Sequence, residues 1–214
     1  MTETPSIKPV PPRQPSRAVI QRAKDMLLKP KESWAAIEGE AETVQSLYVP
    51  YVLVLAAIGP LASLIGGQVF GYRALSFSYH PPLAGAIVTA LLSYGLTLVG
   101  VYIVALVIDA LAPTFDGQKN RIQALKVAVY SATAGWVAGI FSLVPGLAIL
   151  GLLAGLYSLY LLYLGLPRLM KAPEDKAIVY TIVVVVVTAV CIFVVSGILA
   201  AISIGANPAF SGGL

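Results

Sequence analysis

The sequence has few charged residues, one cysteine and one histidine. Asp, Glu, Lys and Arg make up 11% of its 214 residues, whereas hydrophobic residues make up 58% and the mean hydropathy is +0.86. A mean hydropathy this high is far above that of a soluble domain of this length. Cys191 has no second cysteine with which to form an intramolecular disulfide, and its apolar surroundings are typical of a small buried side chain. The composition therefore predicts an integral membrane protein.

The scarcity of reactive side chains also limits the chemistry. His80, the only histidine, lies in the short segment "SYHPP", so the chain has no histidine cluster for zinc and no conventional catalytic triad. No nucleophile, general base or metal-ligand set converges at one depth of the apolar segments. We therefore expect no enzymatic activity, no metal, no cofactor and no nucleic-acid partner.

Five segments are long and apolar enough to cross a hydrocarbon core of about 30 Å, which takes about 20 helical residues. Backbone polar groups in lipid must be satisfied within their own segment, so each segment is predicted to be a helix. The predicted spans are 47–66, 83–110, 124–144, 147–166 and 177–204. The expected fold class is an all-α membrane protein with five transmembrane helices.

The basic residues predict the orientation. Of the 14 basic residues, 13 precede the first span or flank the loops after the second and fourth spans, and Arg73 alone lies on the other side. By the positive-inside rule the N-terminus is cytoplasmic and the C-terminus is outside. Residues 205–214 would then form a short outer tail.

Two segments precede the first span, and neither holds an apolar stretch typical of a cleaved signal peptide. Residues 1–15 contain five prolines and are predicted to be disordered. Residues 16–46 have the apolar spacing of an amphipathic helix, which could lie on the anionic cytoplasmic leaflet or pack on the protein's own cytoplasmic loops. The residues predicted to meet the membrane surface are Arg17, Arg22, Lys24, Lys29 and Trp34.

Glycine pairs predict how two spans pack. Gly135 and Gly139 lie in the third span and Gly151 and Gly155 in the fourth, each pair at the four-residue spacing that lets helix backbones approach closely. The turn Pro145-Gly146 places the two pairs at matching depths in an antiparallel hairpin. We therefore expect the third and fourth spans to pack tightly through their glycines.

Asp109 is the only carboxylate inside a predicted span, which makes it a candidate functional residue. It lies near the cytoplasmic end of the second span, within reach of the headgroup region. We predict an interfacial ion pair of Asp109 with Lys126 or Arg168, and a proton or ion-binding role is the alternative.

Hydroxyl-bearing residues are frequent in the second to fourth spans. Tyr157 lies about 14 Å deeper than Leu166, too deep for an interfacial aromatic belt. A buried phenol needs a hydrogen-bond partner, so these side chains are expected to bond between helices or to line a small cavity open to the cytoplasm. Tyr157 is predicted to contact the second span or this cavity. The candidate cavity residues are Tyr94, Thr97, Tyr130, Tyr157 and Tyr160.

Three stretches together resemble the Yip family, the membrane proteins named for interacting with Ypt/Rab GTPases, and in particular its short bacterial members. They are "LLKPKESWAAI" before the first span, the Pro145-Gly146 turn, and "GLYSLYLLYLGLPRLMKAPEDKA" leading into the last span. The resemblance covers most of residues 20–200. It implies five transmembrane helices with a cytoplasmic N-terminus and, from the eukaryotic members, a link to vesicle trafficking and prenylated GTPases. This chain has a short proline-rich tail where those members have a long cytosolic domain.

Two functions follow from the sequence. The first is a non-enzymatic scaffold or adaptor of a bacterial inner membrane, with anionic lipid at its cytoplasmic face and a protein partner or a second copy of the chain bound to its tail and loops. The alternative is a small transporter or lipid-translocating protein that uses the polar groups of the second to fourth spans.

Overall fold

The structure is a computed structural model that describes residues 15–74 and 77–205. Within these residues the chain is helical apart from a short antiparallel ribbon that pairs Tyr72 with Tyr79. In chain order the elements are α1 (Pro15–Leu28), α2 (Pro30–Gly39), α3 (Val44–Ser46), η1 (Leu47–Val52), α4 (Leu53–Ala56), α5 (Ile58–Val69), β1 (Tyr72–Ala74), β2 (Phe77–Tyr79), α6 (Leu83–Leu111), η2 (Ala112–Phe115), α7 (Arg121–Ser131), α8 (Thr133–Ala138), η3 (Gly139–Leu143), η4 (Pro145–Leu147), α9 (Ala148–Met170), η5 (Glu174–Lys176) and α10 (Ala177–Gly205).

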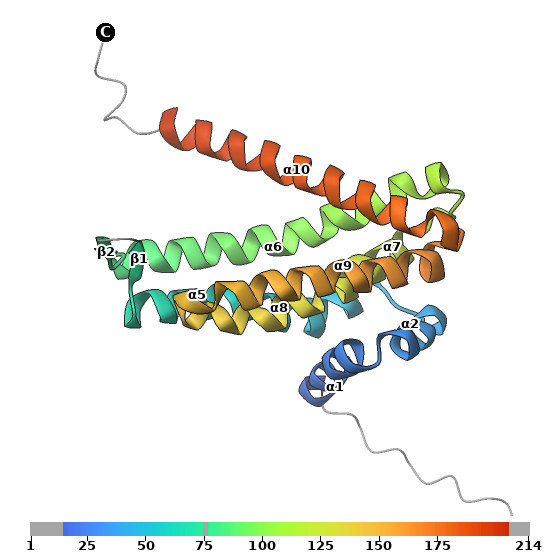
Figure 1. Ribbon diagram of the computed structural model, residues 1–214, viewed down its shortest axis with the longest axis horizontal. Helices are drawn as coiled ribbons and strands as arrows, with labels where there is room; N and C mark the ends of the chain where they lie inside the picture. Colours follow the sequence, from blue (N-terminus) through green and yellow to red (C-terminus); the bar gives the residue numbers. More distant parts are fainter. Residues whose placement is uncertain (1–14, 75–76, 206–214) are drawn as a thin grey trace, which may run out of the picture.

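Four helical stretches of the described chain are long and apolar enough to cross a membrane, namely Val44–Val69, Leu83–Phe115, Arg121–Leu143 and Ile149–Met170. They overlie the first four predicted spans and run along the long axis of the molecule (Figure 1). The chain is therefore an all-helical, multi-pass membrane protein, as predicted. Helix α10 overlies the fifth predicted span.

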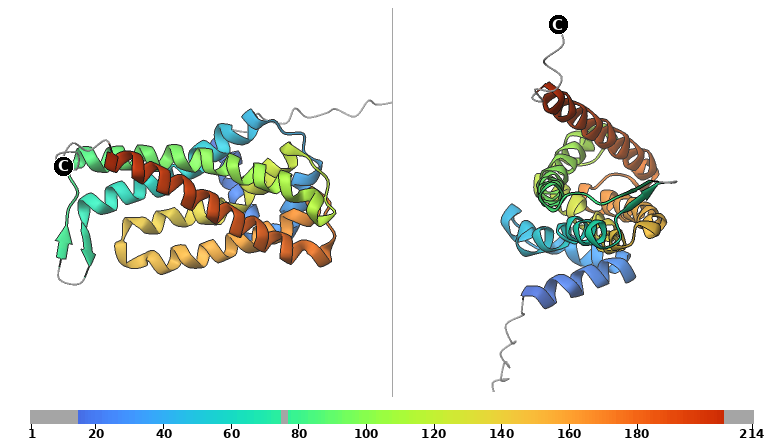
Figure 2. Two further views of the ribbon diagram at one scale, coloured as in Figure 1. Left: turned by 90° about the horizontal axis from the view of Figure 1, so that it is seen from above. Right: turned by 90° about the vertical axis from the view of Figure 1, so that its left-hand side faces the viewer.

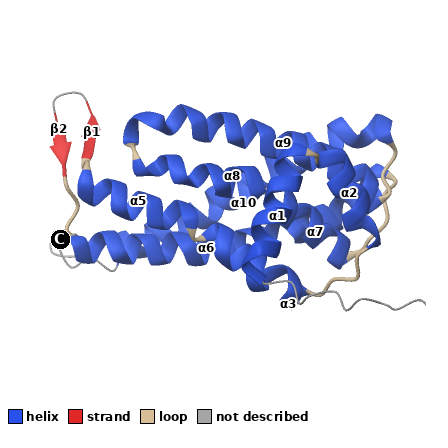
Figure 3. Ribbon diagram, turned by 90° about the horizontal axis from the view of Figure 1, so that it is seen from below, coloured by secondary structure: helices blue, strands red, loops and turns tan. Residues whose placement is uncertain are grey.

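The two ends of the bundle differ. Figure 3 shows β1 and β2 at one end and α2 at the opposite end, and the end-on view in Figure 2 shows α1 and α10 on opposite sides of the bundle. Two predicted segments fall largely beyond the described residues. The tail 1–15 is described only at Pro15, where α1 begins, and the outer tail 205–214 only at Gly205, where α10 ends.

The first and third stretches are interrupted rather than straight. Pro50 lies inside η1, where it removes a backbone donor, and Val49 before it has extended φ and ψ. The third stretch changes from α7 to α8 at Ala132 and finishes as the 3₁₀ helix η3. As a result η1 packs against α1 and α7, while α5 packs against η3 nearer the opposite end.

The protein core lies in the half of the bundle that contains α2 and α7. The eight residues Ala124–Ser131 are all buried, because α6, α9 and η1 pack against α7. Toward the end that carries the β ribbon, α6 and α9 expose large apolar side chains such as Leu91 and Leu152. Such surfaces suit contact with lipid chains. The protein core therefore lies toward the α2 end of the bundle, and the lipid-facing region lies toward the β-ribbon end.

The glycines of the fourth span do not make the predicted packing contact. A Cβ atom placed on Gly151 or Gly155 would meet no atom within 4 Å. Helices α8 and α9 do lie side by side, but their polar contact is a hydrogen bond of 3.1 Å from the Gly135 backbone N–H to the Ser158 Oγ. The third and fourth stretches do pack side by side, and Gly135 faces Ser158 of α9, as predicted. The prediction that Gly151 and Gly155 also pack there is wrong, because a four-residue spacing aligns glycines on one face without specifying which helix covers it.

The close glycine contact joins the first and third stretches instead. A Cβ on Gly139 would lie 2.8 Å from the Cα of Gly59 in α5. A Cβ on Gly66 would lie 2.7 Å from the carbonyl oxygen of Ser142 and against that of Leu143. Helix α5 and η3 therefore approach at two points where only glycine fits.

Candidate functional site

Helices α1 and α2 dock on the bundle through apolar side chains. Met26, Trp34 and Ile37 are fully buried, and α2 packs along α9. The Trp34 ring occupies the space beside Gly165, where a Cβ would lie 2.7 Å from the ring, and it meets the Tyr130 ring edge-on at 6.3 Å between centroids. Two arrangements were predicted for residues 16–46, on the membrane surface or packed on the protein itself. The apolar faces of α1 and α2 pack on the protein.

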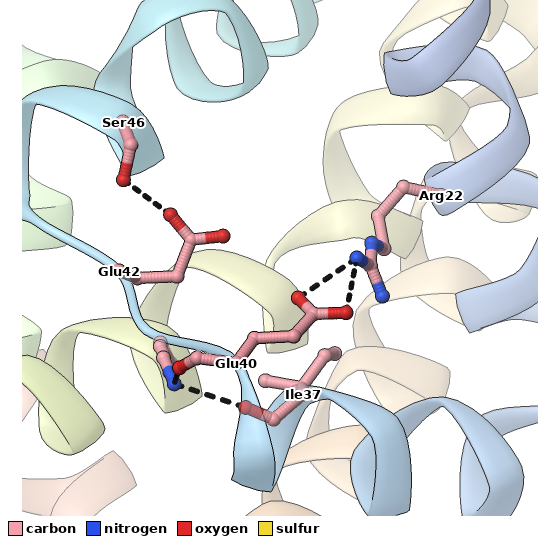
Figure 4. A network of polar contacts seen from close by, with 6 residues as sticks. Arg22, Ile37, Glu40, Glu42 and Ser46 are labelled. Carbon is pink, nitrogen blue, oxygen red and sulfur yellow. Dashed lines mark hydrogen bonds and ion pairs between the residues drawn. The ribbon is translucent and has the colours of Figure 1, made fainter. Parts of the chain in front are cut away.

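A polar network, buried at Lys126 and half-buried at Arg22 and Glu40, secures this contact. Arg22 of α1 donates two hydrogen bonds, of 2.6 and 2.8 Å, to the carboxylate of Glu40, which follows α2 (Figure 4). Lys126 of α7 is only 1% exposed, and its Nζ donates to the carbonyl oxygens of Ile37 at 2.9 Å and Glu40 at 2.5 Å. The last carbonyls of a helix lack intrahelical partners, so Lys126 caps α2 from a different helix. We name Arg22, Trp34, Glu40, Lys126 and Tyr130 the docking junction.

Aromatic rings continue the junction into the bundle. The Arg22 guanidinium lies 5.9 Å from the centre of the Tyr130 ring, a cation–π contact, and the centre of the Tyr51 ring lies 5.0 Å from that of Tyr130. The Tyr51 hydroxyl bonds to the Thr133 Oγ1 at 2.8 Å. The junction is therefore a connected set of hydrogen bonds and ring contacts, an arrangement suited to holding two helices in place.

A second contact joins α2 to the end of α9. The Glu38 carboxylate accepts hydrogen bonds from the Arg168 Nε, at 3.3 Å, and from the Lys171 Nζ. The bond from Lys171 holds the pKa of the Glu38 carboxyl below its usual value. The contribution of this contact to stability is therefore complete above the ordinary carboxyl pKa and is lost only as the pH falls through the lowered one.

Two grooves lie outside the junction. The first, of about 890 Å³, lies between α2 and the last turns of α9, and we name it the α2–α9 groove. It is lined by Lys31, Glu38, Tyr160, Arg168 and Lys171, among others. The second, of about 550 Å³, lies between α5 and α6, and its lining includes Ser63, Thr89, Ser93, Thr97 and Ser142.

The five predicted cavity residues do not share a cavity. Thr97 lines the α5–α6 groove and Tyr160 the α2–α9 groove. Tyr130 belongs to the docking junction, and the Tyr94 hydroxyl donates to the carbonyl of Leu53 at 3.0 Å. Of the two arrangements predicted for these hydroxyls, hydrogen bonding between helices is confirmed for Tyr94 and for Tyr157, whose hydroxyl donates to the Leu27 carbonyl of α1. The alternative of one shared cavity does not describe the five residues.

The predicted ion pair also has different partners. The Asp109 Oδ2 lies 3.9 Å from the Arg121 Nε. Lys126 instead donates to a backbone carbonyl of α2, and Arg168 pairs with Glu38. The Asp109 Oδ1 is buried without a hydrogen-bond partner among the described residues. Asp109 does pair with a cation, but with the first residue of α7 rather than with Lys126 or Arg168. Within the described residues, no cluster of three His, Cys, Asp or Glu side chains could hold a metal ion.

The predicted membrane-surface residues divide into two groups. Trp34 and Arg22 are engaged inside the junction, so the prediction that Trp34 meets the membrane surface is wrong. Lys24 and Lys29 are exposed, and the Arg17 side chain lies outside the described residues. An amphipathic pattern shows that one face is buried, but whether lipid or protein covers that face depends on residues elsewhere in the chain.

Sequence reasoning missed Glu40, Gly165 and the role of Lys126. The signal for Lys126 was present, since a lysine in an apolar span needs internal acceptors. Nothing local indicated that those acceptors would be the last carbonyls of α2, because Ile37 and Lys126 lie 89 residues apart in the chain.

Tyr157 hydrogen-bonds to α1 rather than to the second span. Its hydroxyl donates to the Leu27 carbonyl at 2.7 Å. We expect Tyr157→Phe to lower the free energy of unfolding by about 0.5–1.5 kcal/mol, because that half-buried carbonyl loses its donor. Thermal or denaturant unfolding of the full chain in detergent micelles measures this. Tyr163→Phe is the control, since the Tyr163 hydroxyl bonds to no described residue; equal losses in both variants would contradict the assignment.

The chain matches the Yip1 domain over residues 24–196, which include Trp34, Glu40, Lys126 and Tyr130. It is similar to the inner membrane protein YohC of Escherichia coli strain K12, with 29% identity over 160 residues that cover 71% of this chain and 80% of YohC. YohC of Escherichia coli O6:H1 gives the same values. No solved structure matches the chain. The match over most of its length confirms the resemblance seen in the sequence: the chain belongs to the Yip1-domain family of integral membrane proteins.

Proposed function

We propose that this chain is a non-enzymatic scaffold or adaptor of the bacterial inner membrane, with five transmembrane helices, a cytoplasmic N-terminus and its C-terminus outside. The asymmetry of basic residues supports this topology, and the similarity to inner membrane proteins of Escherichia coli supports the location. The Yip family is not a known enzyme family, which favours a binding role.

The docking junction is the observation that carries the proposal. Because α1 and α2 are fixed by buried contacts, the end of the bundle where they dock is a preorganised surface rather than a loose tail. Preorganised surfaces lose less entropy when they bind a partner. Five of the exposed charged side chains around this end form what we name the platform rim: Lys31, Glu32, Lys119, Lys171 and Glu174.

The outer face of α1 suits contact with lipid headgroups. Ile20 and Leu28 are 69% and 68% exposed, and exposed Lys24 lies between them. A helix with apolar residues and lysines on its free face binds the anionic cytoplasmic leaflet. Anionic lipid is thus the partner proposed for α1, and a protein or a second copy of the chain is the partner proposed for the platform rim.

Transport is not favoured as a second function. Thr97 and Tyr160 line different grooves, Tyr130 belongs to the docking junction, and Tyr94 and Tyr157 hydrogen-bond to backbone carbonyls. The candidate cavity residues therefore line no common path through the bundle. The groove nearest such a path, between α5 and α6, is lined by small and hydroxyl-bearing residues from the half of the bundle near the β ribbon.

A photo-crosslinking amino acid at Glu32 tests the adaptor proposal in living cells expressing the full chain. We expect a discrete covalent adduct with a protein, or with a second copy of this chain, because Glu32 is exposed on the platform rim. The adduct should weaken when Lys126→Met is added, since this change removes the donor to the Glu40 carbonyl and one of the two donors to the Ile37 carbonyl, and so loosens α2.

The matched control carries the crosslinker at Leu91, an exposed position on the lipid-facing part of α6. The same adducts at Leu91 and Glu32, or no adduct at any rim position, would contradict the adaptor proposal.

A further inference from the structure

The α2–α9 groove contains a group of cations that the docking junction does not use. Lys31 comes from α2, Arg168 from the last turn of α9 and Lys171 from the residue that follows it. Two carboxylates, Glu38 and Glu174, also line the groove. Three cations against two carboxylates leave the groove with a net positive charge.

Several donors in this groove are free to bind a ligand. Glu38 engages Arg168 only through Nε, and a guanidinium has five N–H donors, so its two terminal amino groups are left over. Among the described residues no carboxylate lies within ion-pair distance of Lys31. Glu38 therefore orients Arg168 without saturating it.

The rest of the groove is aromatic and apolar. Tyr160, Tyr163, Leu164 and Pro167 line it, and Tyr160 is 40% exposed. Neither tyrosine hydroxyl hydrogen-bonds to another described residue. Tyr160 lies eight residues before Arg168 on α9, so it is about 12 Å deeper along the helix axis. The groove therefore runs from a cationic mouth at the end of the bundle to an aromatic wall beside the lipid-facing surface.

We propose that the α2–α9 groove binds one anionic phospholipid from the leaflet on the α2 side. The phosphate lies between Arg168 and Lys31, where bidentate donors and an ammonium recognise it, and the glycerol and the start of one acyl chain lie along Tyr160 and Leu164. Free phosphate would use only the mouth of the groove, whereas a phospholipid also covers the aromatic wall. This site is separate from the outer face of α1. It shares Lys31, Lys171 and Glu174 with the platform rim, but binding of the phospholipid requires no protein partner there.

Native mass spectrometry of the full-length protein, titrated in detergent with phosphatidylglycerol or with phosphatidylcholine of the same acyl chains, tests this site. We expect phosphatidylglycerol to be retained preferentially, at one lipid per chain. Arg168→Gln should weaken its retention about fivefold, corresponding to about 1 kcal/mol for one cation at the membrane surface. Lys119→Gln is the control, because Lys119 is an exposed lysine outside the groove lining.

Glu38→Gln gives a result of the opposite sign, which loss of folding cannot imitate. Removing the carboxylate that competes for Arg168 and Lys171 should strengthen retention of phosphatidylglycerol. Equal retention of the two lipids, equal loss in Arg168→Gln and Lys119→Gln, or weaker retention in Glu38→Gln would overturn the proposal. Complete displacement of the lipid by inorganic phosphate would also overturn it, because the site would then be a simple anion site.

Discussion

Trp34→Ala is expected to lower the free energy of unfolding by about 3–5 kcal/mol, the range for removing a large aromatic side chain from a packed core. Trp34 is fully buried, and its ring fills the space between Gly165 and Tyr130. Its removal leaves a cavity at the point where α2 meets the bundle. Unfolding of the full chain in detergent micelles measures the loss. Far-ultraviolet circular dichroism is the readout, because it reports helix content and does not need the fluorescence of Trp34.

A double-mutant cycle with Gly165 makes this prediction specific. In the otherwise unchanged protein, Gly165→Ala should cost about 1–3 kcal/mol, because its Cβ would lie 2.7 Å from the rigid Trp34 ring. In the Trp34→Ala background the same change should be neutral or stabilising, since the added methyl group enters the cavity. Additive losses in the double variant would show that the ring does not lie against Gly165.

Gly66→Ala should destabilise the protein by about 1–3 kcal/mol, although it adds only one methyl group. The new Cβ would meet the backbone carbonyl oxygens of Ser142 and Leu143, which cannot rotate away as a flexible side chain can. Helix α5 and η3 would therefore have to separate. The same unfolding measurement applies.

Gly155→Ala is the matched control for Gly66→Ala. Gly155 is also a helical glycine in a predicted span, but a Cβ there meets nothing within 4 Å. We expect no loss of stability, because alanine favours the helix more than glycine does. A larger loss for Gly155→Ala than for Gly66→Ala would restore the glycine-packed hairpin of α8 and α9.

The sequence was sufficient for the helices and insufficient for their contacts. Apolar length determines that a segment such as Leu83–Phe115 is a membrane helix, since lipid leaves the backbone no other arrangement. Which face of a helix meets a neighbour depends on all the other helices at once. Gly151 and Gly155 therefore have the spacing of a packing motif, but no atom of another helix lies against them. Gly66, which was not singled out from the sequence, lies directly against the backbone of Ser142 and Leu143.

The candidate site was predicted in part. Trp34 and Arg22 were singled out by their pattern, but their assignment to the membrane surface missed the partners that bury them. Those partners are Gly165 and Tyr130 for Trp34 and Glu40 for Arg22. Gly165 and Tyr130 lie in other predicted spans, and nothing in their own segments indicates contact with α1 or α2. The hydroxyl of Tyr157 was correctly expected to need an acceptor, and its acceptor in α1 could not be inferred from α9 alone.

The distance in sequence between α1 and its docking surface has a consequence for biosynthesis. Leu27 and Tyr157, which hydrogen-bond in the folded protein, are separated by 130 residues. At about 5–20 residues per second of translation, the ribosome needs about 7–26 seconds to make the chain between them. During that interval the nascent amphipathic segment has its apolar face but no α9 to cover it. The acyl chains of the adjacent leaflet are the nearest available cover, so α1 and α2 would first rest on lipid and transfer to protein only after the fourth span has been inserted.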